Sequence, residues 1–353
     1  MESATRAGPT GLNSGSPGGT VGIADAEIYL SAVKIIIGII GICGNMMVLI
    51  IMKIQTHRGK ILICSQATID MLTSIVFIAD AFTRLNPPSI PQDPYLGYYY
   101  CLIWHYGALV FLLFALSTYN LVAISIERYI LVLYPLYYRM HFSRKKEVLL
   151  GLCAWLVGPV MQVTYCVTQL SYKHGECYVI QIPNRNLLGV LLFVWEYFTP
   201  VVLMGCLFSR ICVKLYKQDK EARSLKANSP LNVTEISTVS CAVPKDSKQQ
   251  KYAVDAKRSL GGHVGKDEAA EYRRSRNITK TFVIIFVVYI LCWSMNQFLF
   301  LQKNLGGYDH WDTAENYFAN CLAMLNSACN PFIYVLHVKQ YRDKVKSFFS
   351  CGN

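Results

Sequence analysis

Amide and ionisable side chains occur inside long apolar stretches of this sequence. They are Asn45, Asp70, Asp80, Glu127, Arg128, Glu196, Asn326 and Asn330. A polar group in a hydrocarbon environment is costly unless it meets another polar group, so each of these residues is a candidate for a binding or relay site. Asn45, Asp70 and Asn330 lie well inside three different stretches, and we expect them to share one buried hydrogen-bonded cluster.

The elements that position these residues are seven apolar stretches long enough to cross a bilayer as helices, which takes about 20 residues each. They cover residues 28–52, 61–82, 101–132, 148–170, 187–209, 278–301 and 314–336. Only 16% of the 353 residues are charged, against about 25% in soluble domains. The sequence therefore predicts an all-α fold, a seven-transmembrane helix bundle over residues 28–336.

The basic residues predict how the bundle is oriented. Of the 34 Lys and Arg, 28 follow the first, third and fifth spans, lie at the inner end of the third or belong to the C-terminal tail. The positive-inside rule places these segments in the cytoplasm and the N-terminus outside the cell. The net charge of +12 is then explained without nucleic acid as a partner. We expect a multi-pass protein of the plasma membrane.

Three segments flank or interrupt the spans. Residues 1–27 are rich in Gly, Ser, Thr and Pro and are expected to be a disordered extracellular tail, and the long cytoplasmic loop over 210–277 is expected to be disordered in its middle. In 338–353, apolar residues recur on one helical face between basic residues, which predicts an amphipathic cytoplasmic eighth helix and a short tail. Cys351 is a candidate palmitoylation site or a free thiol.

Cysteine placement predicts one disulfide. Of 13 cysteines, only Cys101 and Cys177 fall at clearly extracellular positions, where oxidation is permitted. Cys166 and Cys321 fall near the outer surface, so other pairings stay open.

Short motifs follow one another in a fixed order along the seven spans. They are Gly44-Asn45, Asp70, Cys101, Glu127-Arg128-Tyr129 with Pro135, Trp155, Pro200, Cys292-Trp293 and Asn330-Pro331-Phe332-Ile333-Tyr334. With these motifs the chain resembles the rhodopsin-like (class A) G-protein-coupled receptors over all seven spans. The segment 117–126 is most similar to invertebrate peptide-receptor-like members.

The resemblance implies roles in activation. Arg128 would pair with Glu127 at rest and contact a heterotrimeric G protein on activation; the alternative is an arginine that only anchors the helix at the interface. Further activation residues implied by the family are Tyr129, Pro200, Trp293, Asn330, Pro331 and Tyr334. Met295 stands where the family has Pro, Phe208 where Tyr is usual and Tyr289 where Phe is usual, so the details of the relay are expected to differ.

The resemblance also implies an allosteric sodium ion, the single candidate cofactor. Asp70, Ser117, Asn326 and Asn330 resemble the family's sodium pocket, because a carboxylate and neutral oxygens suit a hard cation. The alternative is a hydrogen-bonded packing cluster without metal.

Two ligand classes are disfavoured by single positions. Met324 stands where an opsin carries the lysine that binds retinal, and Val110 stands where amine receptors carry an aspartate. The candidate ligand-binding residues are Asp80, Tyr106, Val110, Glu196, Asn296 and Gln297. Asp80 and Glu196 could accept a cationic group of a peptide; the alternatives are a hydrated acid at Asp80 and an interhelical hydrogen bond at Glu196.

The expected function is a receptor that binds an extracellular peptide between its helices and activates a G protein, with arrestin, receptor kinases and membrane lipid as further partners. The alternatives are a receptor for a non-peptide small molecule and a receptor-like scaffold or decoy that does not signal. A transporter is disfavoured because the two halves show no internal repeat. The spans carry no Gly-x-Ser-x-Gly or His-Glu-x-x-His motif, so an enzyme is not expected.

Overall fold

The helices of the computed structural model follow the predicted spans closely. It describes residues 5–6, 19–54, 59–180, 184–227, 277–306 and 313–350. The first three spans are α1 (Gly19–Ile54), α2 (Lys60–Leu85) and α4 (Ala108–Leu133), and the fourth is α6 (Arg144–Val157) continued by α7 (Val160–Gln169). The fifth runs from α8 (Arg185–Phe193) through the π-helical turn η2 (Val194–Phe198) into α9 (Thr199–Ala227). The sixth is the helix Asn277–Asn304 and the seventh is α11 (Ala314–His337).

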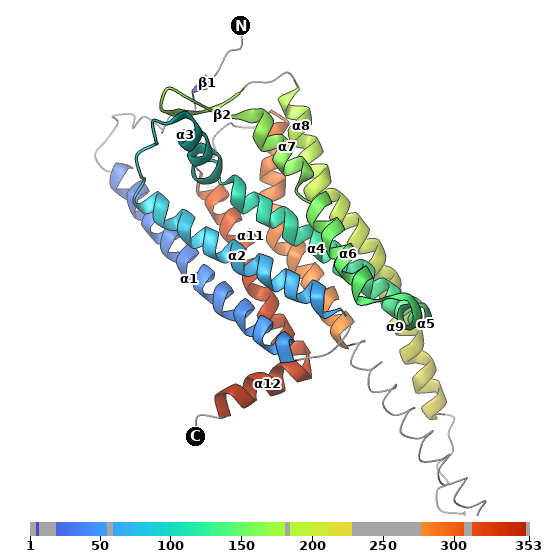
Figure 1. Cartoon of the computed structure of the whole chain (residues 1–353). Helices are drawn as coiled ribbons and strands as arrows, with labels where there is room; N and C mark the ends of the chain where they lie inside the picture. The colour runs from blue at the N-terminus through green and yellow to red at the C-terminus, as the bar shows by residue number, and fades with distance from the viewer. Residues whose placement is uncertain are drawn as a thin grey trace, which may run out of the picture.

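Six helices of the described chain are long and apolar enough to cross a membrane, and α11 with α12 (Lys339–Ser350) provides a seventh. The helices lie side by side, and α12 turns away from α11 by 91° at one end of the bundle (Figure 1). Many large apolar side chains are exposed on the outer surface, among them Ile36, Leu156 and Leu291. Such a surface is suited to contact with lipid. Lipid offers no water to bond the backbone N–H and C=O groups, and a helix pairs these groups internally.

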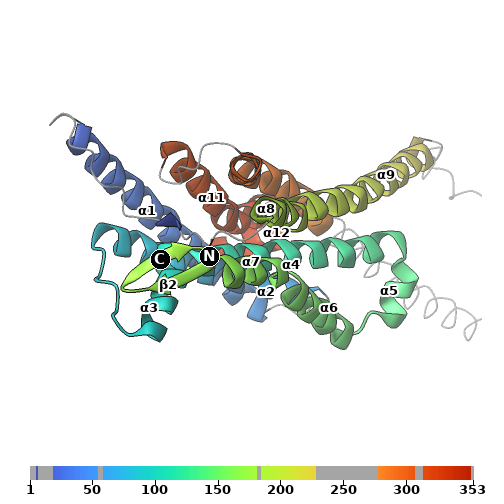
Figure 2. The ribbon, with the colours of Figure 1, turned by 90° about the horizontal axis from the view of Figure 1, so that it is seen from above.

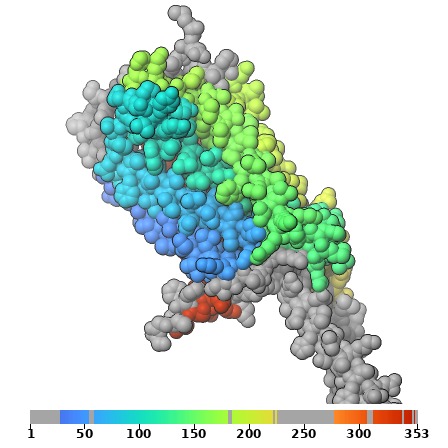
Figure 3. All heavy atoms as spheres, viewed as in Figure 1, coloured from blue at the N-terminus to red at the C-terminus, as the bar shows by residue number. Residues whose placement is uncertain are grey.

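The central helix is α4. A larger share of its residues is buried than in any other spanning helix of the described chain. Seen from above, it runs through the bundle between α2 on one side and α9 and α11 on the other (Figure 2). The space-filling view shows α2, α6 and α7 forming one continuous face, with α12 beneath them (Figure 3). Polar residues of α4 therefore meet polar residues of several other helices.

The opposite end of the bundle carries a small sheet. Strands β2 (Leu170–Lys173) and β3 (Glu176–Val179) form an antiparallel hairpin, and β1 (Thr5–Arg6) pairs with the other edge of β3. The turn of the hairpin has positive φ at both His174 and Gly175, as a tight two-residue turn requires. We refer to this end as the hairpin end and to the other as the α12 end.

Three boundaries differ from those predicted. The third spanning helix begins at Ala108 and not at Cys101, because Gly107 adopts a left-handed conformation with φ 63° that separates α4 from the segment before it. That segment is α3 (Pro94–Tyr100) with the π-helical turn η1 (Cys101–His105). Helix α1 already begins at Gly19, so the end of the tail that was expected to be disordered is helical, and α9 extends to Ala227, beyond the predicted end of the fifth span at residue 209.

Candidate functional site

The Glu127–Arg128 pair lies at the α12 end of α4 and is almost completely buried. Arg128 Nη2 is 2.8 Å from Glu127 Oε2, and the guanidinium lies over the ring of Phe282 from the sixth helix, 5.4 Å from its centroid. The hydroxyl of Tyr138, in the short helix α5 (Pro135–His141), donates to Glu127 Oε1 at 2.5 Å. The structure brings the predicted pair together and adds a partner, Tyr138, that was not predicted.

Tyr138 and the start of α2 bound this pair. Burial raises the pKa of Tyr138, and the negative charge of Glu127 raises it further, so the phenol keeps the proton that it donates. Gly59, directly before α2, has φ +82°, and a Cβ at this position would clash with Arg128 and Glu127. Only glycine therefore fits between the start of α2 and the ion pair. From α6, Glu147 Oε1 accepts the backbone N–H of Ile61 at 2.7 Å and so caps α2.

Asp70 lies at the centre of the predicted polar cluster and is completely buried. Its Oδ2 accepts from Asn330 Nδ2 at 2.8 Å, and its Oδ1 accepts from Ser117 Oγ at 3.0 Å. Gln66 Nε2 lies 3.1 Å from both carboxylate oxygens. Three helices, α2, α4 and α11, therefore meet on one carboxylate.

Two other residues assigned to this region lie beside the cluster. Asn45 joins α1 to α11 by donating to Ser327 O at 3.1 Å and bonds to Gly41 O in its own helix. Asn326 is buried, and its Oδ1 has no hydrogen-bond partner within the described residues. The structure thus brings Asp70, Ser117 and Asn330 into contact. The sodium ion stays a prediction, and the Gln66 amide on the carboxylate fits a cation poorly.

Pro200 changes the backbone of the fifth helix. Because proline has no N–H, the carbonyl of Glu196 loses its helical donor, and a π-helical turn forms over Val194–Phe198. Tyr289 of the sixth helix donates its hydroxyl to Glu196 O at a long 3.4 Å, and Tyr119 donates to Trp195 O at 3.0 Å. Tyr289, one of the departures from the family pattern, thus satisfies a carbonyl that Pro200 leaves free.

The sixth helix is unbroken from Asn277 to Asn304, and it contains Met295 where the family has proline. Trp293 is buried and packs edge-to-face on Phe114 of α4, with ring centroids 4.8 Å apart. Directly after Trp293 in the chain, the hydroxyl of Ser294 meets that of Tyr197. The fifth and sixth helices are therefore linked by side-chain hydroxyls at two levels, through Tyr289 and Ser294.

Pro331 and Tyr334 lie in the half of α11 nearer the α12 end. Gly44 of α1 approaches Pro331 so closely that a Cβ on Gly44 would lie 3.0 Å from the ring. The buried ring of Tyr334 stacks on Tyr341 of α12, with centroids 5.5 Å apart. Tyr129, by contrast, is partly buried at the end of α4. The apolar face of α12 predicted from the sequence thus packs on the bundle through Tyr341; Cys351 lies outside the described residues.

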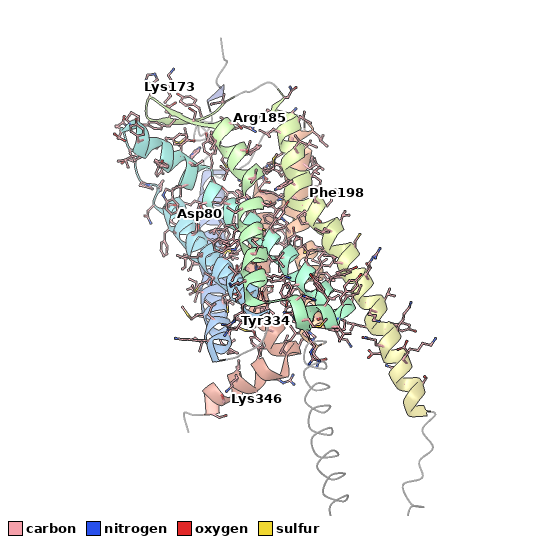
Figure 4. All side chains as sticks on the ribbon, turned by 45° about the vertical axis from the view of Figure 1, so that its right-hand side comes forward. Asp80, Lys173, Arg185, Phe198, Tyr334 and Lys346 are labelled. Carbon is pink, nitrogen blue, oxygen red and sulfur yellow. A yellow bond between two sulfur atoms is a disulfide. The ribbon has the colours of Figure 1, made fainter. Side chains whose placement is uncertain are left out.

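Asp80 is paired on both sides by cations. Its Oδ2 lies 3.0 Å from Lys34 Nζ of α1 and 3.1 Å from Arg84 Nε, one turn further along α2. Lys34 also lies over the ring of Phe77, 5.1 Å from its centroid, and is buried. Figure 4 shows Asp80 in the half of the bundle nearer the hairpin, well below Lys173. A cationic ligand group at Asp80 would therefore compete with two cations of the protein itself.

The other candidate ligand residues lie in the same half of the bundle. Asn296 donates to Asn320 Oδ1 at 2.7 Å, Gln297 is buried, and Val110 packs in the apolar core. Burial raises the pKa of Tyr106 to about 12, against a smaller opposite effect of the Arg185 charge, so its phenol stays a hydrogen-bond donor.

Several buried polar atoms here lack a partner within the described chain: Tyr106 Oη, both amide atoms of Gln169 and Glu196 Oε1. Gln169 is completely buried at the end of α7. Cys166, three residues earlier, belongs to a small apolar cluster against which Tyr106 packs. These atoms come from the segment before α4, from the end of α7 and from η2, and they are donors and acceptors buried without a partner in the described chain.

The predicted disulfide is present. Cys101 and Cys177 are bonded, with Cα atoms 5.5 Å apart, and join the segment before α4 to β3. The alternatives Cys166 and Cys321 are both free and buried.

Some contacting residues were not predicted. Gln66 lies four residues before Asp70, and Lys34 lies eleven residues before Asn45. The spacing between Gln66 and Asp70 puts both on one helix face and was available as a signal. Lys34 is a basic residue inside a span, and its pairing with Asp80 of α2 depends on how the two helices pack. Tyr138 and Glu147 carried no signal, because both lie in a polar connection.

The chain matches a known protein family over most of its length. The family described as 7 transmembrane receptor (rhodopsin family) matches residues 44–334. The chain belongs to this family. The predicted resemblance and seven-helix fold are confirmed, and the protein is a membrane-spanning receptor and not an enzyme.

Individual relatives are distant but extend over most of the chain. The allatostatin-A receptor of Bombyx mori is 23% identical over 89% of this chain and 78% of its own. Neuropeptide receptor 15 of Caenorhabditis elegans is 23% identical over 90% and 88%, and cannabinoid receptor 1 of Xenopus laevis is 23% identical over 92% and 64%. The crystal structure of squid rhodopsin superposes with a TM-score of 0.67 at 17% identity, covering 93% of this chain and 86% of that one.

Proposed function

We propose that this receptor resides in the plasma membrane with its hairpin end outside the cell, binds an extracellular peptide and activates a heterotrimeric G protein at its α12 end. The orientation is supported by basic residues around the α12 end, such as Arg144, Lys145 and Lys146 at the start of α6. Arrestin and receptor kinases at the same end, and lipid around the helices, complete the proposed partners.

The observation that carries the coupling proposal is the buried pair at the end of α4. Arg128 is held by Glu127 on one side and by the Phe282 ring of the sixth helix on the other. A displacement of the sixth helix would remove that ring and uncover the guanidinium, whose planar set of donors can bind carbonyl groups of a partner. An agonist must then bind the uncovered arrangement better than the covered one.

A peptide is supported by the unpartnered polar atoms near the hairpin end. Each buried donor or acceptor without a partner costs about 1–3 kcal/mol, and the peptide backbone offers both N–H and C=O groups to Tyr106, Gln169 and Glu196. One relative is named for neuropeptides and another for cannabinoids. The polar character of this site favours the first class.

The experiment is a second-messenger assay, for cyclic AMP and calcium, in transfected cells exposed to a peptide library with amine and lipid panels. We expect a peptide response that Arg128→Ala abolishes at normal surface expression, whereas Arg144→Ala, an exposed arginine at the same end, retains it. Signalling retained in Arg128→Ala would refute the coupling role. A lipid response alone would overturn the peptide assignment, and silence with normal expression would favour a scaffold or decoy.

A further inference from the structure

The carboxylate of Asp70 is satisfied by a side chain that has no place in the sodium pocket implied by the family. Gln66, one turn earlier on α2, directs its Nε2 at both carboxylate oxygens, 3.1 Å from each. The same nitrogen donates to Ser117 Oγ at 2.6 Å. An atom equidistant from two carboxylate oxygens and close to a hydroxyl occupies the position that a cation would take if it bound Asp70 and Ser117.

The hydrogen bonds run in one consistent direction. Asn120 Nδ2 donates to Gln66 Oε1 at 2.9 Å and to Leu62 O at 3.1 Å. Gln66 Nε2 then donates to Ser117 and Asp70, and Ser117 donates to Asp70 Oδ1 at 3.0 Å. If the Gln66 amide were reversed, its oxygen would face the carboxylate and its nitrogen would face another donor. The network therefore fixes which end of the amide meets Asp70.

A cation and this amide exclude each other. Hard cations take oxygen ligands, and the group presented here is an N–H donor with a partial positive charge. The cation would have to displace the Gln66 side chain, which is held by Asn120 and is completely buried between α2 and α4. Gln66 would then leave its partners inside an apolar bundle, where replacement partners are scarce, and Asn120 would keep only its bond to Leu62 O.

We propose that the Gln66 amide replaces a cation in this receptor: Asp70 is held by an internal donor of α2 that also bonds to α4, and sodium does not bind at the cluster. The inference rests on the family assignment and on these contacts, and it does not depend on the ligand or the G protein. It departs from the sodium ion that the sequence motif implied.

The test compares thermal unfolding of the purified receptor in lipid nanodiscs, with sodium chloride or choline chloride at equal ionic strength. We expect the wild-type midpoint to be the same in both salts. In Gln66→Met, the donor and the bond from Asn120 that holds the side chain over the carboxylate are both removed, so the flexible methionine can turn aside and we expect sodium to raise the midpoint relative to choline. Adding Asp70→Asn should abolish that difference, since the carboxylate is the anion the cation needs.

Two further variants keep the test decisive. Gln66→Ala replaces Gln66→Met if the latter does not fold, and it leaves more room for a hydrated ion. Ser74→Ala is the matched control, because this buried hydroxyl of α2 donates at 2.8 Å to the main-chain oxygen of Asp70 and not to its carboxylate; we expect it to remain insensitive to sodium.

Two results would overturn the proposal. One is a sodium-dependent rise of the wild-type midpoint that disappears in Asp70→Asn, because the cation would then bind with Gln66 in place. The other is the absence of any sodium effect in both Gln66 variants, because the amide would then not be what excludes the ion. Neither result would bear on whether the receptor signals.

Discussion

Tyr138→Phe removes a single hydroxyl from the site that we assign to G-protein coupling. In the structure this hydroxyl donates at 2.5 Å to Glu127, whose other oxygen pairs with Arg128 at 2.8 Å. The ring of Tyr138 stacks on Phe142 with centroids 4.8 Å apart, and phenylalanine retains that contact. The substitution therefore weakens the hold on Glu127 while changing the packing little.

The magnitude follows from the charge of the acceptor. A hydrogen bond to a charged group contributes about 1.5–3 kcal/mol, and the lower value corresponds to about a tenfold change in an equilibrium constant. This bond belongs to the arrangement in which Arg128 is covered, so its loss raises the population of the uncovered arrangement. If that population is about 1% without agonist, we expect ligand-independent signalling to rise by about tenfold or more.

The assay is basal second-messenger output divided by receptor number at the cell surface. Tyr137→Phe is the matched control, because the neighbouring tyrosine is exposed and lies against His141 through its ring alone. We expect elevated basal output from Tyr138→Phe and wild-type output from Tyr137→Phe. Equal basal output from both variants, at equal expression, would refute the view that Tyr138 holds the resting arrangement through Glu127.

Three other substitutions test separate contacts by thermal unfolding of the purified receptor. Gly59→Ala should lower the midpoint, because the left-handed conformation costs a Cβ about 1–2 kcal/mol and the new methyl group meets Arg128. Lys34→Met should destabilise by less than the roughly 3–5 kcal/mol of a fully broken buried pair, since Asp80 keeps its second cation. Tyr289→Phe should cost about 0.5–1.5 kcal/mol, the worth of one neutral hydrogen bond.

Each of these three predictions has a control or an outcome that would contradict it. Gly205→Ala, where a Cβ would make an ordinary 3.8 Å contact inside α9, should not lower the midpoint. Adding Asp80→Asn to Lys34→Met should recover part of the loss if the two charges interact. If Tyr289→Phe were as stable as the wild type, the 3.4 Å contact between the Tyr289 hydroxyl and the Glu196 carbonyl would contribute nothing to the stability of the receptor.

The spans could be predicted from the sequence because bilayer thickness imposes a minimum length on every helix that crosses it. The disulfide followed from the small number of cysteines at one end of the bundle. The break at Gly107 and the π-helical turn before Pro200 were not predicted, since apolar composition is the same on either side of each. Such irregularities are set by backbone geometry, which hydropathy does not report.

The polar cluster marks the limit of transferring a motif from a family. The motif supplied Asp70, Ser117 and Asn330, and the structure joins them by direct hydrogen bonds. The motif does not include Gln66, although Gln66 contacts both oxygens of the carboxylate. A motif names the groups that can bind an ion, but whether an ion binds depends on which neighbouring side chain reaches the same oxygens first. Here that neighbour is Gln66, one helical turn away, and its amide nitrogen reaches both oxygens. The carboxylate of Asp70 therefore accepts hydrogen bonds from the protein where the family motif implies a cation.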